Sequence, residues 1–161
     1  MKRLVYLISP NKINNNFYSA LTKVLKTKKV KFFQLRLKKE TKKRKKFIAK
    51  KVQIICKKYR VKFIINDDPY FTLKIKADGC HLGQKDMNVI EARKILKNKI
   101  IGITCHNSVR LAKKAKLNGA SYIAIGAFFK TNTKKVLYKA NVKTLKKIKM
   151  SVNLPVVAIG G

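Results

Sequence analysis

The sequence predicts an α/β fold in which strands and helices alternate along the chain. Short apolar runs rich in Val, Ile, Phe and Tyr recur at steady intervals. Several of these runs are apolar throughout, as expected for strands buried on both faces of a parallel sheet. The Lys-rich segments between them carry apolar residues three and four apart, which is typical of amphipathic helices. Alternation of this kind gives parallel strands joined by right-handed crossovers.

Seven strands with about six intervening helices are expected from this pattern. The predicted strands are LVYLIS (4–9), VKFFQLR (30–36), VKFIIN (61–66), the weaker ADGCHLG (77–83), KIIGITC (99–105), ASYIAIG (120–126) and LPVVAIG (154–160). Two architectures fit this order, namely an open doubly wound sheet and a (β/α) barrel. Because no GxGxxG follows the first strand and no GxxxxGK[ST] occurs, the common nucleotide-binding open sheets lose support.

Two of the helices can be placed from their apolar stripes. Segment 47–59 is predicted to bury Phe47, Val52, Ile55 and Cys56 on one face. Segment 108–120 is predicted to place Val109, Ala112, Ala115 and Lys116 near one face. Gly119 is expected to end this helix. Asn107 or Ser108 is the expected N-cap of this second helix.

Strands two to seven each place polar or glycine residues at or just after their C-terminal ends, which favours a site at the mouth of a barrel. They are Gln34, Arg36 and Lys38; Asn66, Asp67 and Asp68; His81, Gln84 and Asp86; Thr104 and His106; Thr131, Thr133 and Lys134; Gly160 and Gly161. Each group also has a simpler explanation. Asn66 to Pro69 alone is typical of a turn with a helix cap, and either histidine is explained equally well as a hydrogen-bonded structural residue.

The chain carries 41 Lys and Arg against six acidic residues, a net charge of +35. The lysines are spread along the chain, which indicates solvated helix faces. Weak polyanion binding is expected as a side effect, and no specific nucleic-acid partner is expected. The cysteines show no CxxC pair and indicate buried thiols in a reducing compartment, the cytoplasm. No apolar run approaches the ~18 residues of a membrane helix, so no membrane partner is expected.

Four of the six acidic residues, Asp67, Asp68, Asp78 and Asp86, fall within residues 65–86. Asp67 and Asp86 end adjacent predicted strands, and carboxylates at such positions suit one hard cation such as Mg²⁺. Basic residues after the second strand, together with Lys134, suit an anionic ligand. The hypothesis is a Mg²⁺–diphosphate site.

The motifs of this chain resemble, in order, those of the thiamine-phosphate synthase family. They are QLRLK (34–38), INDD (65–68), ADGCHLGQKD (77–86), IGITCH (101–106), GASYIAIGAFFKTNTK (119–134) and PVVAIGG (155–161). The resemblance implies a TIM barrel that joins 4-amino-2-methyl-5-hydroxymethylpyrimidine diphosphate to thiazole phosphate and releases pyrophosphate. The reaction it implies is dissociative, with a pyrimidinylmethyl cation captured by the thiazole nitrogen, so that no protein nucleophile is needed.

The resemblance also implies a role for each matching position. Gln34, Leu35, Arg36, Leu37, Lys38 and Asn66 would contact the pyrimidine diphosphate; Asp67 and Asp86 would bind Mg²⁺; Thr104 would lie near the diphosphate; Thr131, Asn132 and Thr133 would hold the thiazole phosphate, which the backbone of Gly161 would approach. Arg36, Lys38 and Lys134 would neutralise the leaving group.

The chain departs from the family pattern at its C-terminal end. A single barrel domain over residues 1–161, with seven of eight strands and without the last two helices, is the expectation. Such a barrel exposes two strand edges, through which self-association or completion by a partner is expected. Lys130 stands where the family commonly has Pro. Two alternative functions stay open: a thiazole tautomerase-like protein with His106 as acid or base, and a non-catalytic basic polyanion-binding module.

Overall fold

The computed structural model describes residues 4–129 and 138–160, in which strands and helices alternate. The strands are β1 (Val5–Ile8), β2 (Val30–Leu35), β3 (Lys62–Asn66), β4 (Gly79–Leu82), β5 (Ile100–His106), β6 (Tyr122–Ile125) and β7 (Val156–Ala158). The helices are α1 (Phe17–Lys26), α2 (Lys42–Lys58), α3 (Pro69–Lys74), α4 (Val89–Leu96), α5 (Val109–Leu117) and α6 (Val142–Ser151). The hydrogen-bonding order of the seven strands is their order along the chain. The predicted α/β order of strands and helices is therefore confirmed.

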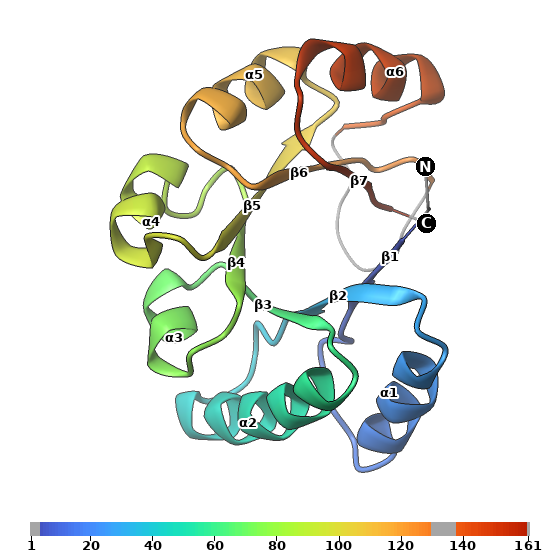
Figure 1. Cartoon of the computed structure of the whole chain (residues 1–161), viewed down its shortest axis with the longest axis vertical. Coiled ribbons are helices and arrows are strands. Elements are labelled where there is room, and N and C mark those ends of the chain that lie inside the picture. Colours follow the sequence, from blue (N-terminus) through green and yellow to red (C-terminus); the bar gives the residue numbers. More distant parts are fainter. Residues whose placement is uncertain (1–3, 130–137, 161) are drawn as a thin grey trace. The chain divides into compact units, whose positions relative to one another are not determined.

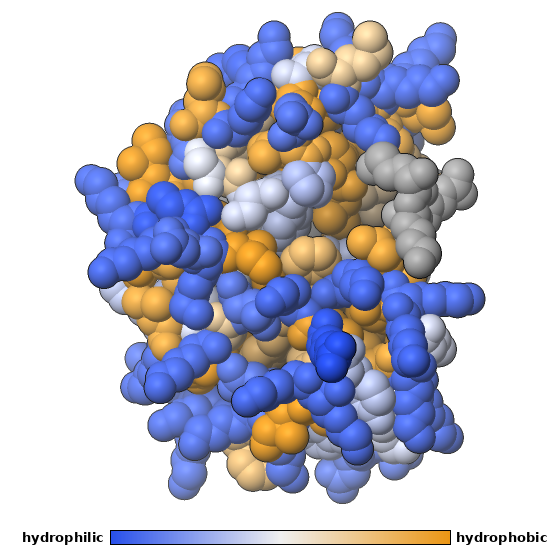
Figure 2. Space-filling view, in the orientation of Figure 1, coloured by the Kyte–Doolittle hydropathy of each residue, from blue (hydrophilic) through white to orange (hydrophobic). Residues whose placement is uncertain are grey.

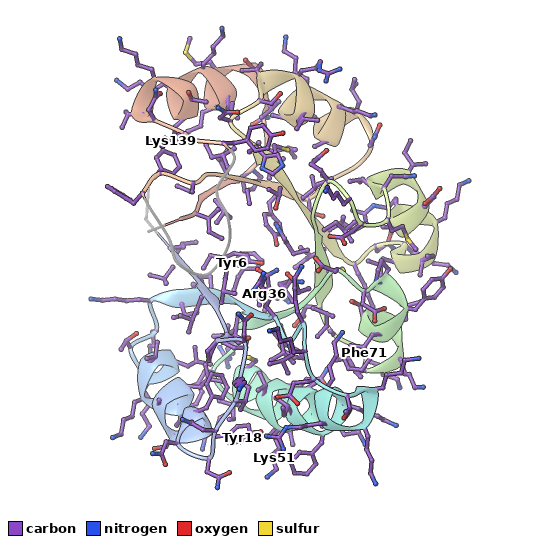
Figure 3. All side chains as sticks on the ribbon, turned by 180° about the vertical axis from the view of Figure 1, so that it is seen from behind. Tyr6, Tyr18, Arg36, Lys51, Phe71 and Lys139 are labelled. Atoms are coloured by element: carbon purple, nitrogen blue, oxygen red, sulfur yellow. The ribbon has the colours of Figure 1, made fainter. Side chains whose placement is uncertain are left out.

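The chain divides into two compact units, Met1–Cys80 and His81–Gly161. In the first unit, β1, β2 and β3 are parallel neighbours, and α1, α2 and α3 lie on the same side of these strands (Figure 1). Phe33 and Phe63 stack in the core between strands and helices, with ring centroids 6.5 Å apart. Lys51 of α2 lies over the Tyr18 ring of α1, 5.4 Å from its centroid, and joins the two helices (Figure 3).

In the second unit, β5, β6 and β7 are parallel neighbours, with Gly102 paired to Tyr122 and Ile125 to Ala158. Helices α4, α5 and α6 lie on one side of these strands (Figure 1). Ile101, Ile123 and Ile125 are fully buried. Strand β6 buries both of its faces, since Tyr122, Ile123, Ala124 and Ile125 are all buried, whereas β7 is only partly buried.

Helix α2 differs from the predicted 47–59 segment at its start and on its buried face. It begins at Lys42, where the Thr41 side chain accepts a hydrogen bond from the Arg44 amide. Its buried residues are Ile48, Ala49, Val52 and Cys56. Phe47 is 58% exposed, so its predicted burial is wrong. Five residues advance about 140° around a helix, which turns Phe47 away from Val52.

Helix α5 is close to its prediction. Ser108 is the N-cap, and its side chain accepts a hydrogen bond from the Leu111 amide. Ala112 and Ala115 are buried, whereas Lys116 is exposed and was wrongly placed near the buried face. Gly119 has a φ of 85°, a left-handed conformation that glycine adopts without steric cost and that ends the helix as predicted.

Hydrophilic side chains project from much of the face shown in Figure 2.

Cys56, Cys80 and Cys105 are buried and form no disulfide, as expected for structural thiols. Burial raises the pKa of each of these thiols to about 12, with nearby acidic charges adding to the effect at Cys56 and Cys80. Within residues 4–129 and 138–160, no helix combines the length and the apolar character needed to cross a membrane.

Candidate functional site

Strand β2 separates a core-facing row of leucines from a row of polar side chains. Leu35 and Leu37 are buried in the core at 0% and 5% exposure. Successive side chains of a strand point to opposite faces, so Gln34 and Arg36 lie on the other side. Gln34 is 2% exposed, and its Nε2 donates to Asn66 Oδ1 over 2.7 Å. The structure thus brings together two residues predicted for the site, from β2 and β3.

Arg36 is held by residues that follow β1. Its Nη1 donates to Asn11 Oδ1 over 2.7 Å, and its backbone N–H donates to Ser9 Oγ over 2.9 Å. Figure 3 labels Arg36 on the segment that follows β2. Ser9 and Asn11 were not predicted for the site, although they stand at and just after the end of the first predicted strand, as the other polar groups stand at the ends of strands two to seven. That shared position was the signal available in the sequence.

Asp67 and Lys38, both predicted site residues, form an ion pair. Lys38 Nζ lies 3.1 Å from Asp67 Oδ2, and the side chains are 52% and 28% exposed. Asp67 has a φ of 65°, an uncommon conformation for a residue other than glycine. An ion pair this accessible to water contributes little to stability. It does balance the charges of both groups at the end of β3.

The neighbouring carboxylates have structural roles. Asp68 is the N-cap of α3, and its Oδ1 accepts a hydrogen bond from the Phe71 N–H over 2.8 Å. The simpler explanation of the Asn66–Pro69 segment, a turn with a helix cap, is therefore right for Asp68. Asp78 Oδ2 accepts from the Phe63 N–H over 2.8 Å, and its Oδ1 lies 3.3 Å from Lys62 Nζ. Structural hydrogen bonds therefore account for two of the four acidic residues in segment 65–86, without any ligand.

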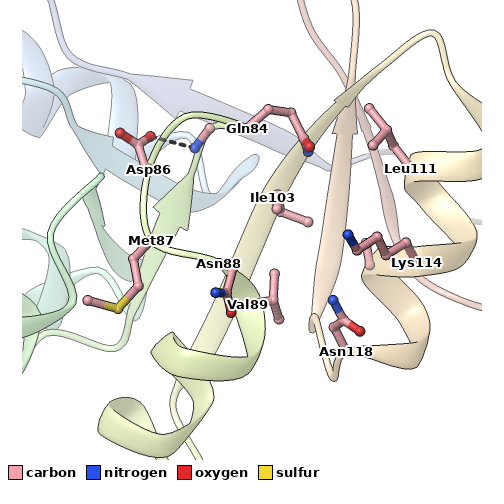
Figure 4. A pocket seen from close by; sticks show the side chains of 11 residues that line it. Gln84, Asp86, Met87, Asn88, Val89, Ile103, Leu111, Lys114 and Asn118 are labelled. Carbon is pink, nitrogen blue, oxygen red and sulfur yellow. Dashed lines mark hydrogen bonds between the residues drawn. The ribbon is translucent and has the colours of Figure 1, made fainter.

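In the second unit, Asp86 lies in the loop between β4 and α4. Its Oδ2 accepts a hydrogen bond from the Gly83 N–H over 2.7 Å, drawn as a dashed line in Figure 4. A Cβ at position 83 would lie 2.9 Å from this oxygen, so a glycine allows the close approach. Beside this loop, between the start of α4 and α5, is a pocket of about 140 Å³ that Lys114 also lines.

Thr104 on β5 is held by His81, which lies on β4, and by Gln84, which lies in the loop after β4. Its Oγ1 is 3.0 Å from His81 Nε2, and its carbonyl accepts from Gln84 Nε2 over 2.5 Å. His81 Nδ1 is in turn 2.9 Å from the Tyr122 hydroxyl. Burial lowers the pKa of His81 to about 4, although the charge of Asp86 acts in the opposite direction. His81 is therefore a neutral, hydrogen-bonded residue.

The remaining predicted residues fall into two groups. Thr131, Asn132, Thr133, Lys134 and Gly161, as well as Lys130, lie outside the described residues. His106 is described: its φ is 54° and its ring centroid lies 4.3 Å from that of Tyr138. Asp67 belongs to the first unit and Asp86 to the second. Among the residues that the structure describes, no group of three or more His, Cys, Asp or Glu side chains could hold a metal.

Comparisons with known proteins agree along the whole chain. A family model described as thiamine monophosphate synthase matches residues 5–161. A thiamine-phosphate synthase of Pelagibacter ubique is 63% identical over 161 residues, which are 99% of this chain and 78% of that protein. One of Fusobacterium nucleatum is 46% identical over 160 residues, 98% of this chain and 77% of that protein.

A solved structure, thiamine phosphate pyrophosphorylase from Pyrococcus furiosus, has a TM-score of 0.85 at 29% identity. The similarity covers 99% of this chain and 76% of that one. Together with the strand order β1 to β7, this similarity confirms the predicted fold class, a (β/α) barrel, with seven parallel strands among the residues that the structure describes.

Proposed function

Because the chain belongs to the thiamine monophosphate synthase family, we propose that it condenses 4-amino-2-methyl-5-hydroxymethylpyrimidine diphosphate with thiazole phosphate. The products are thiamine phosphate and pyrophosphate. The observation that carries the proposal is the family match over residues 5–161, together with 63% identity to a thiamine-phosphate synthase. The names of the relatives favour this activity over a tautomerase with His106 as its acid or base. The charged and polar groups at the strand ends are suited to a diphosphate.

The pyrimidine diphosphate is proposed to bind at the end of β2 and β3. Gln34 and Asn66 are joined by a 2.7 Å hydrogen bond, so each fixes the amide of the other for contact with the substrate. Leu35 and Leu37 would contribute backbone groups, because their side chains are in the core. Arg36 is oriented by Asn11 and keeps further N–H donors of its guanidinium for phosphate oxygens.

The Lys38–Asp67 pair prepares both residues for a charged ligand. A lysine and a carboxylate 3.1 Å apart already balance one another. A cation bound by Asp67 would weaken this attraction and release Lys38 to an anionic oxygen. Arg36, Lys38 and Lys134 are then proposed to neutralise the negative charge that grows on the leaving pyrophosphate. Removing one such group costs about 3 kcal/mol of transition-state stabilisation, by analogy with an oxyanion-hole donor.

Asp67 and Asp86 are the residues proposed to hold Mg²⁺. Their oxygens are hard ligands of the kind that Mg²⁺ prefers, and two protein carboxylates suffice because the ion keeps several waters. Each is oriented within its own unit, Asp67 by Lys38 and Asp86 by the Gly83 amide. When bound, the ion would supply positive charge to the diphosphate.

The proposed reaction breaks the C–O bond between the pyrimidine methylene and the diphosphate, and the bonding electrons leave with pyrophosphate. The nitrogen of the thiazole ring forms the new C–N bond with the resulting cation. The protein's part is to hold the two substrates in line and to balance the charge of the leaving group. Thr131, Asn132, Thr133 and the backbone of Gly161 are proposed to hold the thiazole phosphate.

The high positive charge supports substrate capture. Both substrates are anions, and the chain has a net charge of +35. Association with them is therefore expected to slow as salt is added. A cytoplasmic location is proposed with this function, in keeping with three buried cysteines that form no disulfide. A single domain over residues 1–161 and self-association through strand edges are proposed as well.

The direct test is to incubate the purified chain with both substrates and Mg²⁺ and to measure thiamine phosphate. We expect Mg²⁺-dependent product formation, with kcat/KM lowered about 10²–10³-fold in Lys38→Ala. Lys46→Ala is the matched control, because it removes the same charge from an exposed position on α2. Wild-type protein without product, or equal rates in the two variants, would overturn the proposal.

A further inference from the structure

A row of hydrogen bonds crosses three strands of the second unit behind Thr104. Tyr122 of β6, His81 of β4 and Thr104 of β5 are joined by contacts of 2.9 Å and 3.0 Å. Tyr122 and His81 are only 4% and 7% exposed. The two buried rings therefore lie behind a residue that the proposed function places beside the diphosphate, and neither has a role in the chemistry described so far.

The protonation of His81 decides what Thr104 offers to a ligand. A neutral imidazole carries one N–H and one acceptor nitrogen. If Nε2 carries the proton, Tyr122 donates to Nδ1 and His81 donates to Thr104 Oγ1. The Thr104 hydroxyl proton is then available to another acceptor, such as a ligand. If Nδ1 carries the proton, the Thr104 hydroxyl donates to Nε2 and presents only lone pairs to a ligand. Only the first arrangement makes the Thr104 hydroxyl a donor to an anion.

We propose that His81 and Tyr122 are positioning residues that keep Thr104 as a hydrogen-bond donor to the diphosphate, with His81 in its Nε2–H form. This inference rests on the proposed function, which supplies the anion. All three hydrogen bonds then run in one direction, from Tyr122 through His81 and Thr104 to a phosphate oxygen. Hydrogen bonds arranged in such a row strengthen one another.

The backbone around Thr104 is shaped for this row. Gly102, two residues earlier on β5, lies on the same face of the strand and is paired to Tyr122. A Cβ at Gly102 would overlap Cζ, Oη and Cε1 of the Tyr122 ring. Gln84 holds the carbonyl of Thr104 at the same time. Glycine at position 102 thus makes room for the ring whose hydroxyl reaches His81.

The tautomer of His81 can be measured without any substrate. The chain has two histidines, so ¹⁵N–¹H correlation spectra of the full-length protein with labelled histidine contain two ring systems, which a His106→Gln variant assigns. We expect a protonated Nε2 and an unprotonated Nδ1 for His81 near pH 7. Addition of pyrophosphate and Mg²⁺ should leave this form unchanged. An Nδ1–H form would overturn the proposal.

A double-mutant cycle tests whether Tyr122 acts through Thr104. Tyr122→Phe keeps the ring but removes the hydroxyl that contacts neutral His81, and we expect kcat/KM to fall about tenfold, the upper end for one hydrogen bond between neutral groups. Thr104→Val should lower kcat/KM by itself, and Thr104→Ser should recover most of that loss, because serine keeps the hydroxyl. In a Thr104→Val background, Tyr122→Phe should have no further effect.

The same tenfold loss in both backgrounds would show a merely structural role for Tyr122 and refute the inference. Wild-type protein that forms no thiamine phosphate would instead refute the proposed function. In that case the spectrum of His81 still decides the direction of the hydrogen bonds from Tyr122 to Thr104. It is recorded on wild-type protein and does not depend on whether a Tyr122 variant folds.

Discussion

Gly102→Ala should destabilise the second unit strongly, although it adds one methyl group. That methyl would lie well under 3.0 Å from two ring carbons and the hydroxyl oxygen of Tyr122. The ring is 4% exposed, and moving it away breaks its 2.9 Å contact with His81. Overpacking costs about 1–3 kcal/mol, and a buried polar group that loses its partner costs about 1–3 kcal/mol more. We expect the free energy of unfolding to fall by about 2–6 kcal/mol.

Urea denaturation followed by circular dichroism measures this loss. The same substitution should be made in a Tyr122→Leu background, because leucine lacks the two ring carbons and the hydroxyl oxygen that overlap the new methyl group. There we expect Gly102→Ala to cost less than about 1 kcal/mol, since no contact remains to be relieved. An equal loss in both backgrounds would show that the steric reasoning is wrong.

Three further outcomes follow from the buried and capping groups. Burial lowers the pKa of His81 from 6.5 to about 4, so between pH 6.5 and pH 4 the unfolded chain binds more protons than the folded one. The resulting stability of about 3 kcal/mol is fully present above pH 6.5 and should be lost as the pH falls toward 4. Urea midpoints from pH 7 to 4 test this, and His81→Gln should flatten the dependence. Cys56, Cys80 and Cys105, with pKa values raised to about 12, should react with iodoacetamide at pH 8 only after denaturation. Asp68→Ala should cost about 1 kcal/mol as a lost N-cap and leave Mg²⁺ dependence unchanged; a loss of Mg²⁺ binding would contradict its assignment as a cap.

The sequence predicted β3 and β6 well because most of their residues are buried, on both faces of each strand. Apolar runs such as VKFIIN have no alternative location in a domain of this size, and β3 lies within that run. The alternation of Gln34 and Leu35 also predicted which β2 side chains would face the core, since the period of a strand is fixed at two. Helix faces were less certain. Phe47 was assigned to the buried stripe of α2, but a helical period of 3.6 places it on the exposed side.

Contacts between distant parts of the chain could not be predicted from residue patterns. The pairing of Tyr122 with His81 joins positions 41 residues apart and depends on strand register. Asp67 and Asp68 are adjacent and chemically identical, yet one pairs with Lys38 and the other caps α3. Their difference follows from the positive φ of Asp67, which is a property of the folded backbone.

The proposal on which the proposed function most depends is that Asp67 and Asp86 bind Mg²⁺ together with a diphosphate. Calorimetric titration of the full chain with pyrophosphate, with and without MgCl₂, tests it most directly. Asp67→Asn and Asp86→Asn, alone and together, should abolish the Mg²⁺-dependent part of binding. Glu91→Gln, which removes one negative charge from an exposed position on α4, should retain it. Pyrophosphate binding that is independent of Mg²⁺, or that survives the loss of both carboxylates, would contradict the claim.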